Sequence, residues 1–250
     1  IVLAGWSGGG SLMMWYQALA EAGAGISNTA AGDPYTVAAS RLPAANSIMM
    51  LAAHVSRHRI FTEWLDPSIT DESQPHLRDA QLNLYDAANP NQPPYSSDFL
   101  EHFAQAQVAR NRRITAWVKE KLAAIRASDS PWSEFAFTVH GTMADPRWLD
   151  PSIEPSDRKA GSCYLGDPKI VNDGPVGLGR FCTLRSWLSQ WSYDDARCDA
   201  IASGSRISVP VLVIGNSADD ACTPSHTQRL YDAVTHEQKH LHVVKGATHY

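Results

Sequence analysis

The sequence is poor in the features that mark several classes of protein. Its 250 residues hold four cysteines and no CxxC pair, which argues against a disulfide scaffold and a structural zinc site. Its apolar runs fall short of the roughly 18 residues that a membrane span needs. It lacks a basic excess, with 21 Lys and Arg against 26 Asp and Glu. We therefore expect free thiols, a reducing, cytoplasmic compartment and a small-molecule partner rather than nucleic acid or a membrane.

The sequence also lacks an initiator methionine. It opens on the apolar run Ile1-Val2-Leu3-Ala4, which is typical of a buried strand, and it stops abruptly at Tyr250. We expect residues to be omitted at both ends, because a strand with this pattern would otherwise form a bare sheet edge. A mass measurement of the intact protein tests this expectation.

Strand and helix patterns alternate at both ends of the chain. A tight glycine turn and a helix ending near Gly23 follow the first strand. Thr223 as N-cap and Pro224 predict the start of a helix that runs to about Val234. Further strands are expected at 47–53, 209–214 and 241–244.

The middle of the chain, from about residue 60 to 205, has a different pattern. One long helix is expected over roughly 98–127 with Ser97 as its cap, followed by a strand or extended segment at 135–139. The string WLDPSI occurs at 64–69 and again at 148–153, which predicts two similar Asp-Pro turns held by aspartate side chains. Arg110, Arg112 and Arg113 are interpreted as a solvated helix face.

Four tryptophans of this region are interpreted mainly as packing residues, with a wall of the substrate pocket as the alternative. They are Trp132, Trp148, Trp187 and Trp191.

The chemistry is indicated by Gly5-Trp6-Ser7-Gly8-Gly9, which fits G-x-S-x-G. In this motif the serine occupies a strained turn between strand and helix, and the glycines on either side prevent steric collisions. Ser7 is therefore the candidate nucleophile, and the N–H of Gly8 is the candidate oxyanion donor.

A serine nucleophile needs a base, and the base needs an acid to orient it. Asp219 follows the strand 209–214 by one loop, and His249 follows the strand 241–244 in the same way. Asp220 is the alternative acid, although the distance from the strand end favours Asp219. His54, which closes the second strand, is a further candidate for contact with substrate.

These residues resemble the α/β-hydrolase superfamily. The likeness rests on the Ser7 motif, on VPVLVIGNSAD ending at Asp219, and on KGATHY with His249. It implies an α/β fold with a mostly parallel sheet flanked by helices and an inserted, mainly helical cap. The expected domains are a core at 1–59 and 206–250 with the cap at 60–205. The family takes a second oxyanion donor from a loop before the elbow, so here that donor is expected upstream of Ile1.

The implied function is that of a serine hydrolase with the triad Ser7, Asp219 and His249, which needs no metal and no organic cofactor. Its expected substrate is a small apolar or aromatic carboxylic ester, lactone or thioester. Amide or carbon–carbon bond hydrolysis, acyl transfer, and a non-catalytic binding role on the same fold are the alternatives. Fold alone does not decide among them.

Overall fold

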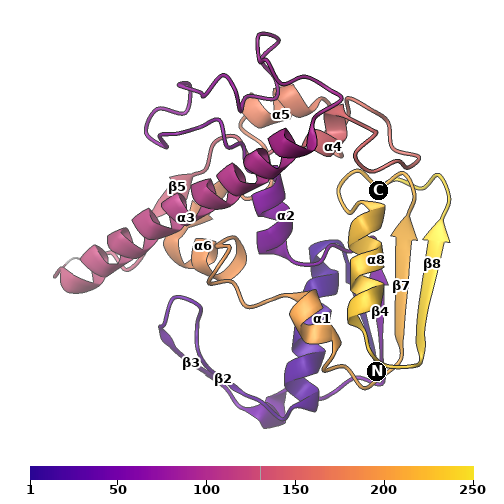
Figure 1. Ribbon diagram of the computed structural model, residues 1–250. Coiled ribbons are helices and arrows are strands. Elements are labelled where there is room, and N and C mark those ends of the chain that lie inside the picture. Colours follow the sequence, from indigo (N-terminus) through magenta and orange to yellow (C-terminus); the bar gives the residue numbers. More distant parts are fainter. Residues whose placement is uncertain (130) are drawn as a thin grey trace. The chain divides into compact units, whose positions relative to one another are not determined.

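The computed structural model describes residues 1–129 and 131–250 (Figure 1). The chain divides into two compact units, each described here by itself. Unit 1 consists of Ile1–Ile60, Glu154–Lys159 and Arg197–Tyr250, and unit 2 consists of Phe61–Ile153 and Ala160–Ala196. The segments 154–159 and 197–205, which lie in the expected cap range, are therefore grouped with unit 1.

Unit 1 is built on a four-stranded parallel sheet. Its strand order is β1-β4-β7-β8, with β1 at Val2–Trp6, β4 at Ser47–Leu51, β7 at Val211–Asn216 and β8 at Lys239–Val244. All three strand pairs are parallel, so the four carboxyl ends lie at one edge of the sheet. The expected α/β class with a parallel sheet and flanking helices is confirmed.

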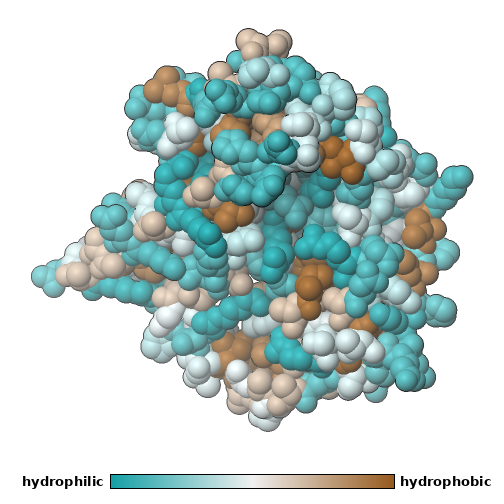
Figure 2. Space-filling view, viewed as in Figure 1, coloured by the Kyte–Doolittle hydropathy of each residue, from teal (hydrophilic) through white to brown (hydrophobic). Residues whose placement is uncertain are grey.

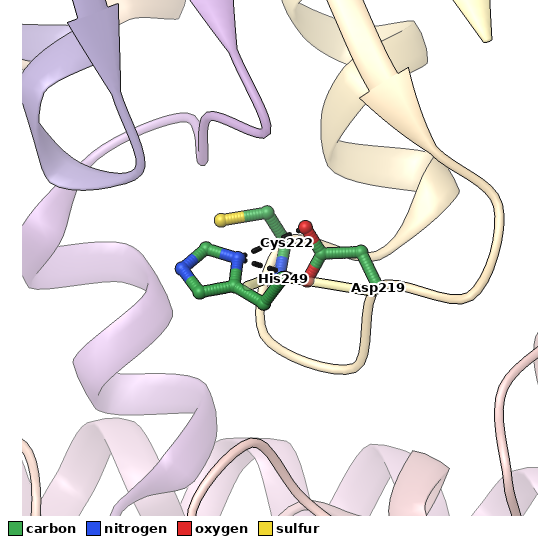
Figure 3. A group of neighbouring side chains, drawn as sticks. All are labelled: Asp219, Cys222 and His249. Atoms are coloured by element: carbon green, nitrogen blue, oxygen red, sulfur yellow. Dashed lines mark hydrogen bonds and ion pairs between the residues drawn. The ribbon is translucent and has the colours of Figure 1, made fainter. Parts of the chain in front are cut away.

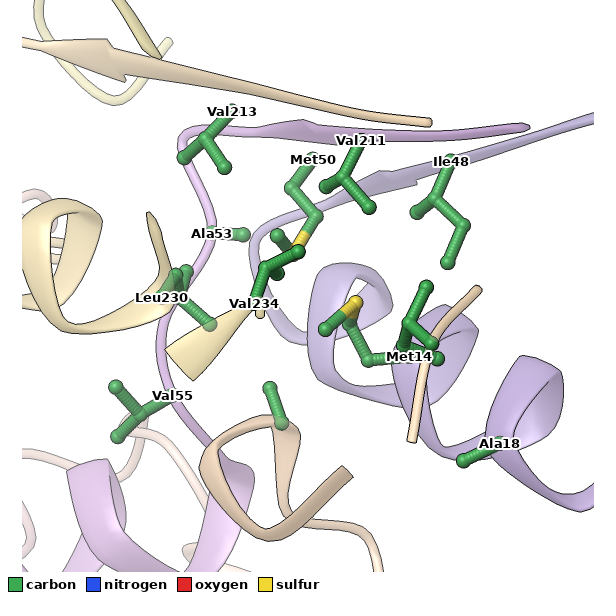
Figure 4. Close-up of a cluster of buried hydrophobic side chains, with 12 residues drawn as sticks. Met14, Ala18, Ile48, Met50, Ala53, Val55, Val211, Val213, Leu230 and Val234 are labelled. Atoms are coloured by element: carbon green, nitrogen blue, oxygen red, sulfur yellow. The ribbon is translucent and has the colours of Figure 1, made fainter. Parts of the chain in front are cut away.

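Helices cover one face of this sheet. They are α1 (Gly8–Glu21), α7 (Ala200–Gly204) and α8 (Pro224–Ala233). The core between these helices and the strands consists of Met14, Ala18, Ile48, Met50, Ala53, Val55, Ala200, Ile207, Val211, Val213, Leu230 and Val234 (Figure 4). Each fully buried large apolar side chain contributes about 1.5–3 kcal/mol, so this layer holds the strand ends in place.

The first strand is not buried, contrary to the sequence prediction. β1 is an edge strand paired with β4 alone, and Val2 and Trp6 are 61% and 47% exposed. The apolar run correctly indicated a strand, but its burial depends on neighbours that the run itself does not define. Unit 1 also contains an unpredicted hairpin, β2 (Ile26–Asn28) with β3 (Pro34–Val37), followed by a short 3-10 helix at Ala39–Arg41.

Unit 2 is mainly helical and irregular. Helix α2 (Arg57–Trp64) leads into it from unit 1. Its other elements are α3 (Ser97–Ala127), β5 (Ala136–Thr138), α4 (Pro146–Leu149), α5 (Pro168–Asp173), β6 (Phe181–Thr183) and α6 (Leu184–Gln190). The long predicted helix is confirmed, but its cap is Ser96 rather than Ser97, because the Ser96 side chain accepts from the Phe99 N–H.

Arg110 is fully buried, so the prediction of a solvated arginine face is wrong for this residue. All five of its N–H donors are used. Two reach the carboxylate of Glu72, and three reach the carbonyl oxygens of Asp66, His140 and Gly141, at 2.7–3.0 Å. A buried guanidinium is tolerated when its donors are satisfied in this way. The side chain therefore fastens α3 to loops that have no regular structure of their own.

The two copies of WLDPSI form the same local turn, as predicted. In the first, Asp66 Oδ1 accepts from the backbone and hydroxyl of Ser68. In the second, Asp150 Oδ1 accepts from the same two groups of Ser152. The copies are also neighbours, since the Trp64 and Trp148 rings lie 5.3 Å apart. These aspartates thus have a structural role.

The tryptophans of unit 2 mostly pack, as the main interpretation held. Trp148, Trp187 and Trp191 are at most 9% exposed, whereas Trp132 is 75% exposed.

On the face seen in Figure 2, hydrophilic residues predominate and hydrophobic patches are small and separate. Among the residues that the model describes, we find no helix with the length and apolar character required to cross a bilayer.

Candidate active site

Ser7 lies in the turn that joins β1 to α1. Its φ of 53° and ψ of −122° are in a region that side-chain-bearing residues rarely adopt. The turn is held by the Ser7 N–H, which donates to the Leu51 carbonyl oxygen on the neighbouring strand at 3.0 Å. Serine at a helix N-cap usually caps with its hydroxyl, but this hydroxyl makes no cap bond. Its oxygen is instead directed to His249.

The glycines around Ser7 differ in how much they are needed. A Cβ at Gly5 would lie 2.5 Å from the Gly9 backbone, and one at Gly10 would lie 2.4 Å from the Ala53 Cβ. A Cβ at Gly9 would meet no atom of the described residues within 4 Å. The expectation that both motif glycines prevent collisions therefore holds for Gly5 and is wrong for Gly9, whose missing side chain would extend into open space.

The structure brings Ser7, Asp219 and His249 together from three separate loops. Ser7 Oγ lies 3.2 Å from His249 Nε2, and His249 Nδ1 lies 2.9 and 3.1 Å from the two carboxylate oxygens of Asp219. A carboxylate can only accept, so Nδ1 carries the proton and Nε2 faces the Ser7 hydroxyl as an acceptor. Asp219 and His249 are buried.

Backbone contacts join the acid loop to the histidine loop. The Ala218 N–H donates to the Ala247 carbonyl oxygen at 3.0 Å, and Asn216 Nδ2 donates to that of Thr248 at 2.6 Å. The segment 154–159 supports the end of the acid loop and the start of α8, because Glu154 accepts hydrogen bonds from Thr223 and Ser225. Thr223 thus stands at the N-cap of α8 as predicted, but its hydroxyl donates to Glu154 and makes no cap bond.

The Asp219 carboxylate lies within hydrogen-bonding distance of His249 Nδ1, as the distance from the strand end predicted. Asp219 Oδ1 also accepts from the backbone N–H groups of Ala221 and Cys222, at 2.9 and 2.7 Å, which fixes its orientation. Asp220 is partly buried, and desolvation together with the negative charge of Asp219 raises its pKa to about 6. Two adjacent carboxyl groups therefore have different environments, which is common at functional sites.

Cys222 is a neighbour that sequence reasoning did not connect with the site. Figure 3 shows its thiol beside the paired Asp219 and His249. Ligand atoms of these three residues lie within 4.8 Å of one another, which is compatible with a metal site. Burial raises the pKa of the Cys222 thiol well above its ordinary value, and the negative charge of Asp219 raises it further. Asp219 and His249 already bond each other.

An aromatic group surrounds the histidine. The Trp6 ring stacks on the His249 imidazole at 5.0 Å, and the Tyr250 ring meets it edge-on at 5.1 Å. Trp6 fills the variable position before the serine, so the motif alone gave no signal for this contact. The stacking restricts rotation of the imidazole and keeps Nε2 directed at Ser7.

A serine nucleophile also needs a hydrogen-bond donor for the negative charge that develops on the carbonyl oxygen under attack. Gly8 is the first residue of α1, so its N–H belongs to the first turn, where backbone donors have no partner within the helix. The positive end of the helix dipole lies at the same place. The arrangement can thus generate a serine nucleophile and hold an oxyanion beside it.

No family model and no curated protein matches this chain. Among solved structures, a monoacylglycerol lipase of Paleococcus ferrophilus has a TM-score of 0.39 and 15% identity, over 100% of this chain and 60% of that one. VinJ has a TM-score of 0.35 and 17% identity, over 99% and 58%. A putative non-heme bromoperoxidase, BpoC, of Mycobacterium tuberculosis H37Rv has a TM-score of 0.31 and 15% identity, over 99% of this chain and 59% of that one.

The chain thus spans about three fifths of the length of these structures. At this identity and TM-score the fold class rests on the chain's own parallel sheet and on the order of its serine, acid and histidine loops.

Proposed function

We propose that this chain is a serine hydrolase of the α/β-hydrolase type that cleaves a carboxylic ester, lactone or thioester of a small substrate with an apolar or aromatic body. The observation that carries the proposal is the continuous contact from Ser7 Oγ through His249 to the Asp219 carboxylate, at 3.2 and 2.9 Å. The strained serine turn supports it, because such strain is retained where the surrounding structure and a function require it.

The proposed mechanism has two steps. Ser7 Oγ attacks the carbonyl carbon while His249 Nε2 takes its proton, and Asp219 holds the Nδ1–H and stabilises the imidazolium. The carbonyl oxygen becomes an oxyanion that accepts from the Gly8 N–H. Collapse breaks the bond to the leaving group, which receives the proton from His249. Water, deprotonated by His249, then attacks the acyl carbon, the bond to Ser7 Oγ breaks, and Oγ takes the proton from His249 as the acid leaves.

A panel of 4-nitrophenyl esters, 4-nitroanilides and β-diketones tests the reaction class. We expect turnover of the esters and much slower or no turnover of the other two, with Ser7→Ala reducing ester turnover by a factor of about 10³ or more. Faster cleavage of the anilides or the diketones would reassign the reaction. Ester turnover that survives in Ser7→Ala would remove Ser7 from the mechanism.

A further inference from the structure

Unit 2 contains a cavity of about 610 Å³ whose lining residues all belong to that unit. The lining comes from three segments, namely the loop 70–73, one face of α3 and the chain at 135–139. A volume of roughly 300–1,000 Å³ is typical of sites that hold small molecules. Ser7, Asp219 and His249 belong to unit 1 and take no part in this lining.

Three aromatic rings line the cavity, those of Trp117, Phe135 and Phe137. Both phenylalanine rings meet the Trp117 ring at steep angles, with centroids 6.2 and 5.1 Å from it. Trp117 and Phe135 are nevertheless each 41% exposed, whereas Ile114 and Val139 of the same lining are buried. A ligand that covers the two rings therefore gains apolar contact that the protein alone leaves unmade.

The carboxylate of Glu72, which also lines the cavity, is already bonded. Arg110 donates to its two oxygens at 3.0 and 2.7 Å, and Arg113 donates to one of them at 3.2 Å. Arg113 is itself part of the lining and also donates to the Ile69 carbonyl oxygen at 2.7 Å. These charged groups thus pair within the protein.

Asp71 is the third charged residue of the lining. Its carboxylate accepts from the backbone and hydroxyl of Ser73 and from the side-chain amide of Gln74, at 2.8, 2.7 and 3.2 Å. The two carboxylates of the lining are matched by the guanidinium groups of Arg113 and Arg110, so the formal charge of this group is zero. The balance favours an uncharged ligand.

A charge on the ligand would be disfavoured with either sign. An anion would meet the carboxylates of Asp71 and Glu72, and like charges that face each other repel. A cation would meet Arg113, and the best aromatic face for it is partly used, because Lys121 Nζ lies 4.8 Å from the Phe135 ring centroid. Either ion would also lose hydration on entering a cavity lined mainly by apolar groups.

We propose that this cavity is a binding site for an uncharged small molecule with an aromatic ring system, which packs against Trp117, Phe135 and Phe137. The inference concerns a second site and does not depend on the proposed ester hydrolysis.

The test compares three ligands with the same naphthalene body, namely uncharged 2-acetylnaphthalene, anionic 2-naphthoate and cationic 2-naphthylmethylammonium. Calorimetric titration of the full-length protein gives their Kd values. We expect one molecule of 2-acetylnaphthalene to bind per chain with a Kd on the order of 100 µM or below. Both charged ligands should bind at least about fivefold more weakly. Equal or tighter binding of either charged ligand overturns the assigned ligand class.

Variants of the aromatic rings locate the ligand. Trp117→Leu and Phe135→Leu should each weaken the binding of 2-acetylnaphthalene by about tenfold, and Trp117→Phe should retain part of it. Both side chains are 41% exposed, so we expect the fold to survive, as an unchanged Tm would show. Phe181→Leu is the matched control, because Phe181 belongs to the same unit, is 71% exposed and does not line the cavity. An unchanged Kd in both leucine variants overturns the inference.

Ser7→Ala separates this site from the triad. The Kd of 2-acetylnaphthalene should be the same in Ser7→Ala, and a loss of binding there would place the ligand at Ser7 and overturn the inference. Failure of a fluorophosphonate to label Ser7 would instead end the proposed function and leave this second site standing. Sedimentation velocity tests a second copy of the chain as the occupant. A dimer that Trp117→Leu dissociates would assign the cavity to self-association, against the proposal.

Discussion

In unit 1 the buried side chains of Asp219 and His249 at the strand ends form a line of contacts to the Ser7 hydroxyl, whereas in unit 2 the buried side chain of Arg110 bonds mainly to backbone carbonyl oxygens of the loops around it. Asp219 and His249 connect to a serine that is withheld from its usual capping role. Arg110 and Asp66 bond to carbonyl oxygens, a hydroxyl and other charged groups. These bonds hold loops together and do not activate a nucleophile.

The difference follows from how each unit is stabilised. Unit 1 has a layered apolar core between a parallel sheet and its helices, so polar groups at the sheet edge are not needed for its architecture. Unit 2 also buries many apolar side chains, among them a cluster around Phe99 and Phe103, but much of its chain runs in long irregular segments. Backbone groups in such segments must still be satisfied, and the buried arginine and aspartates satisfy them. Burial of a charged residue alone therefore does not mark the candidate site, since Asp199 of unit 1 is also buried and serves as the N-cap of α7 and the partner of Arg59.

The largest expected effect lies on the unit 1 side of this comparison. Asp219→Asn keeps Oδ1 as an acceptor for two backbone N–H groups but presents an amide N–H to His249, which favours the wrong tautomer. We expect kcat for ester hydrolysis to fall by about 10⁴ with the fold intact. Asp220→Asn is the matched control and should cost less than about tenfold, since a neighbouring charge alone is a small term. Equal losses in the two variants would break the assignment of Asp219.

On the unit 2 side, Arg110→Met should destabilise the protein without touching the chemistry. It removes one donor from each of three carbonyl oxygens and two from the Glu72 carboxylate. We expect a loss of about 3–5 kcal/mol in the free energy of unfolding, measured by urea denaturation. Arg112→Met, on the same helix, removes a pair whose side chains are 58% and 51% exposed and should cost at most about 1 kcal/mol. Similar losses for both would mean that the Arg110 network is dispensable.

Asp220 gives a smaller effect with a defined dependence on pH. Its folded pKa of about 6 lies above the unfolded value of about 3.9, so folding favours the protonated form. Its contribution to stability is fully present below about pH 4 and is lost as the pH rises through 6. Because the group is partly exposed, the loss is on the order of 1 kcal/mol.

Asp220→Asn removes this titration. The variant should therefore have a higher Tm than the unmodified protein at pH 8 and the same Tm at pH 4, as measured by calorimetry. A Tm difference that is constant across this range would contradict the buried-carboxyl explanation.

The smallest effect is expected at Gly9. It lies in α1 and has open space at its Cβ position, so Gly9→Ala should stabilise the fold by up to about 1 kcal/mol through lower chain entropy. Gly10→Ala is the contrasting variant, since its Cβ would collide with Ala53, and it should lower the Tm. Destabilisation by Gly9→Ala would show that another part of the protein occupies that space.

Sequence reasoning was strongest where one motif carries both local structure and chemistry. The G-x-S-x-G turn and the loops after the predicted strands 209–214 and 241–244 were enough to predict that Ser7, Asp219 and His249 meet. Patterns with two meanings gave weaker results: three arginines on one helix did not reveal that Arg110 is buried, and two adjacent serines did not reveal which one caps. The cavity of unit 2 could not be predicted, because its lining comes from segments far apart in the sequence and not from any repeating pattern.

The central claim is that Ser7 is activated by His249 and Asp219. Reaction of the full-length protein with a fluorophosphonate, followed by peptide mass spectrometry, tests it directly. The account predicts one labelled residue, Ser7, with labelling abolished in Ser7→Ala and strongly slowed in Asp219→Asn, while Ser11→Ala labels like the unmodified protein. Absence of labelling at Ser7, or labelling that is equally fast in Asp219→Asn, would contradict it.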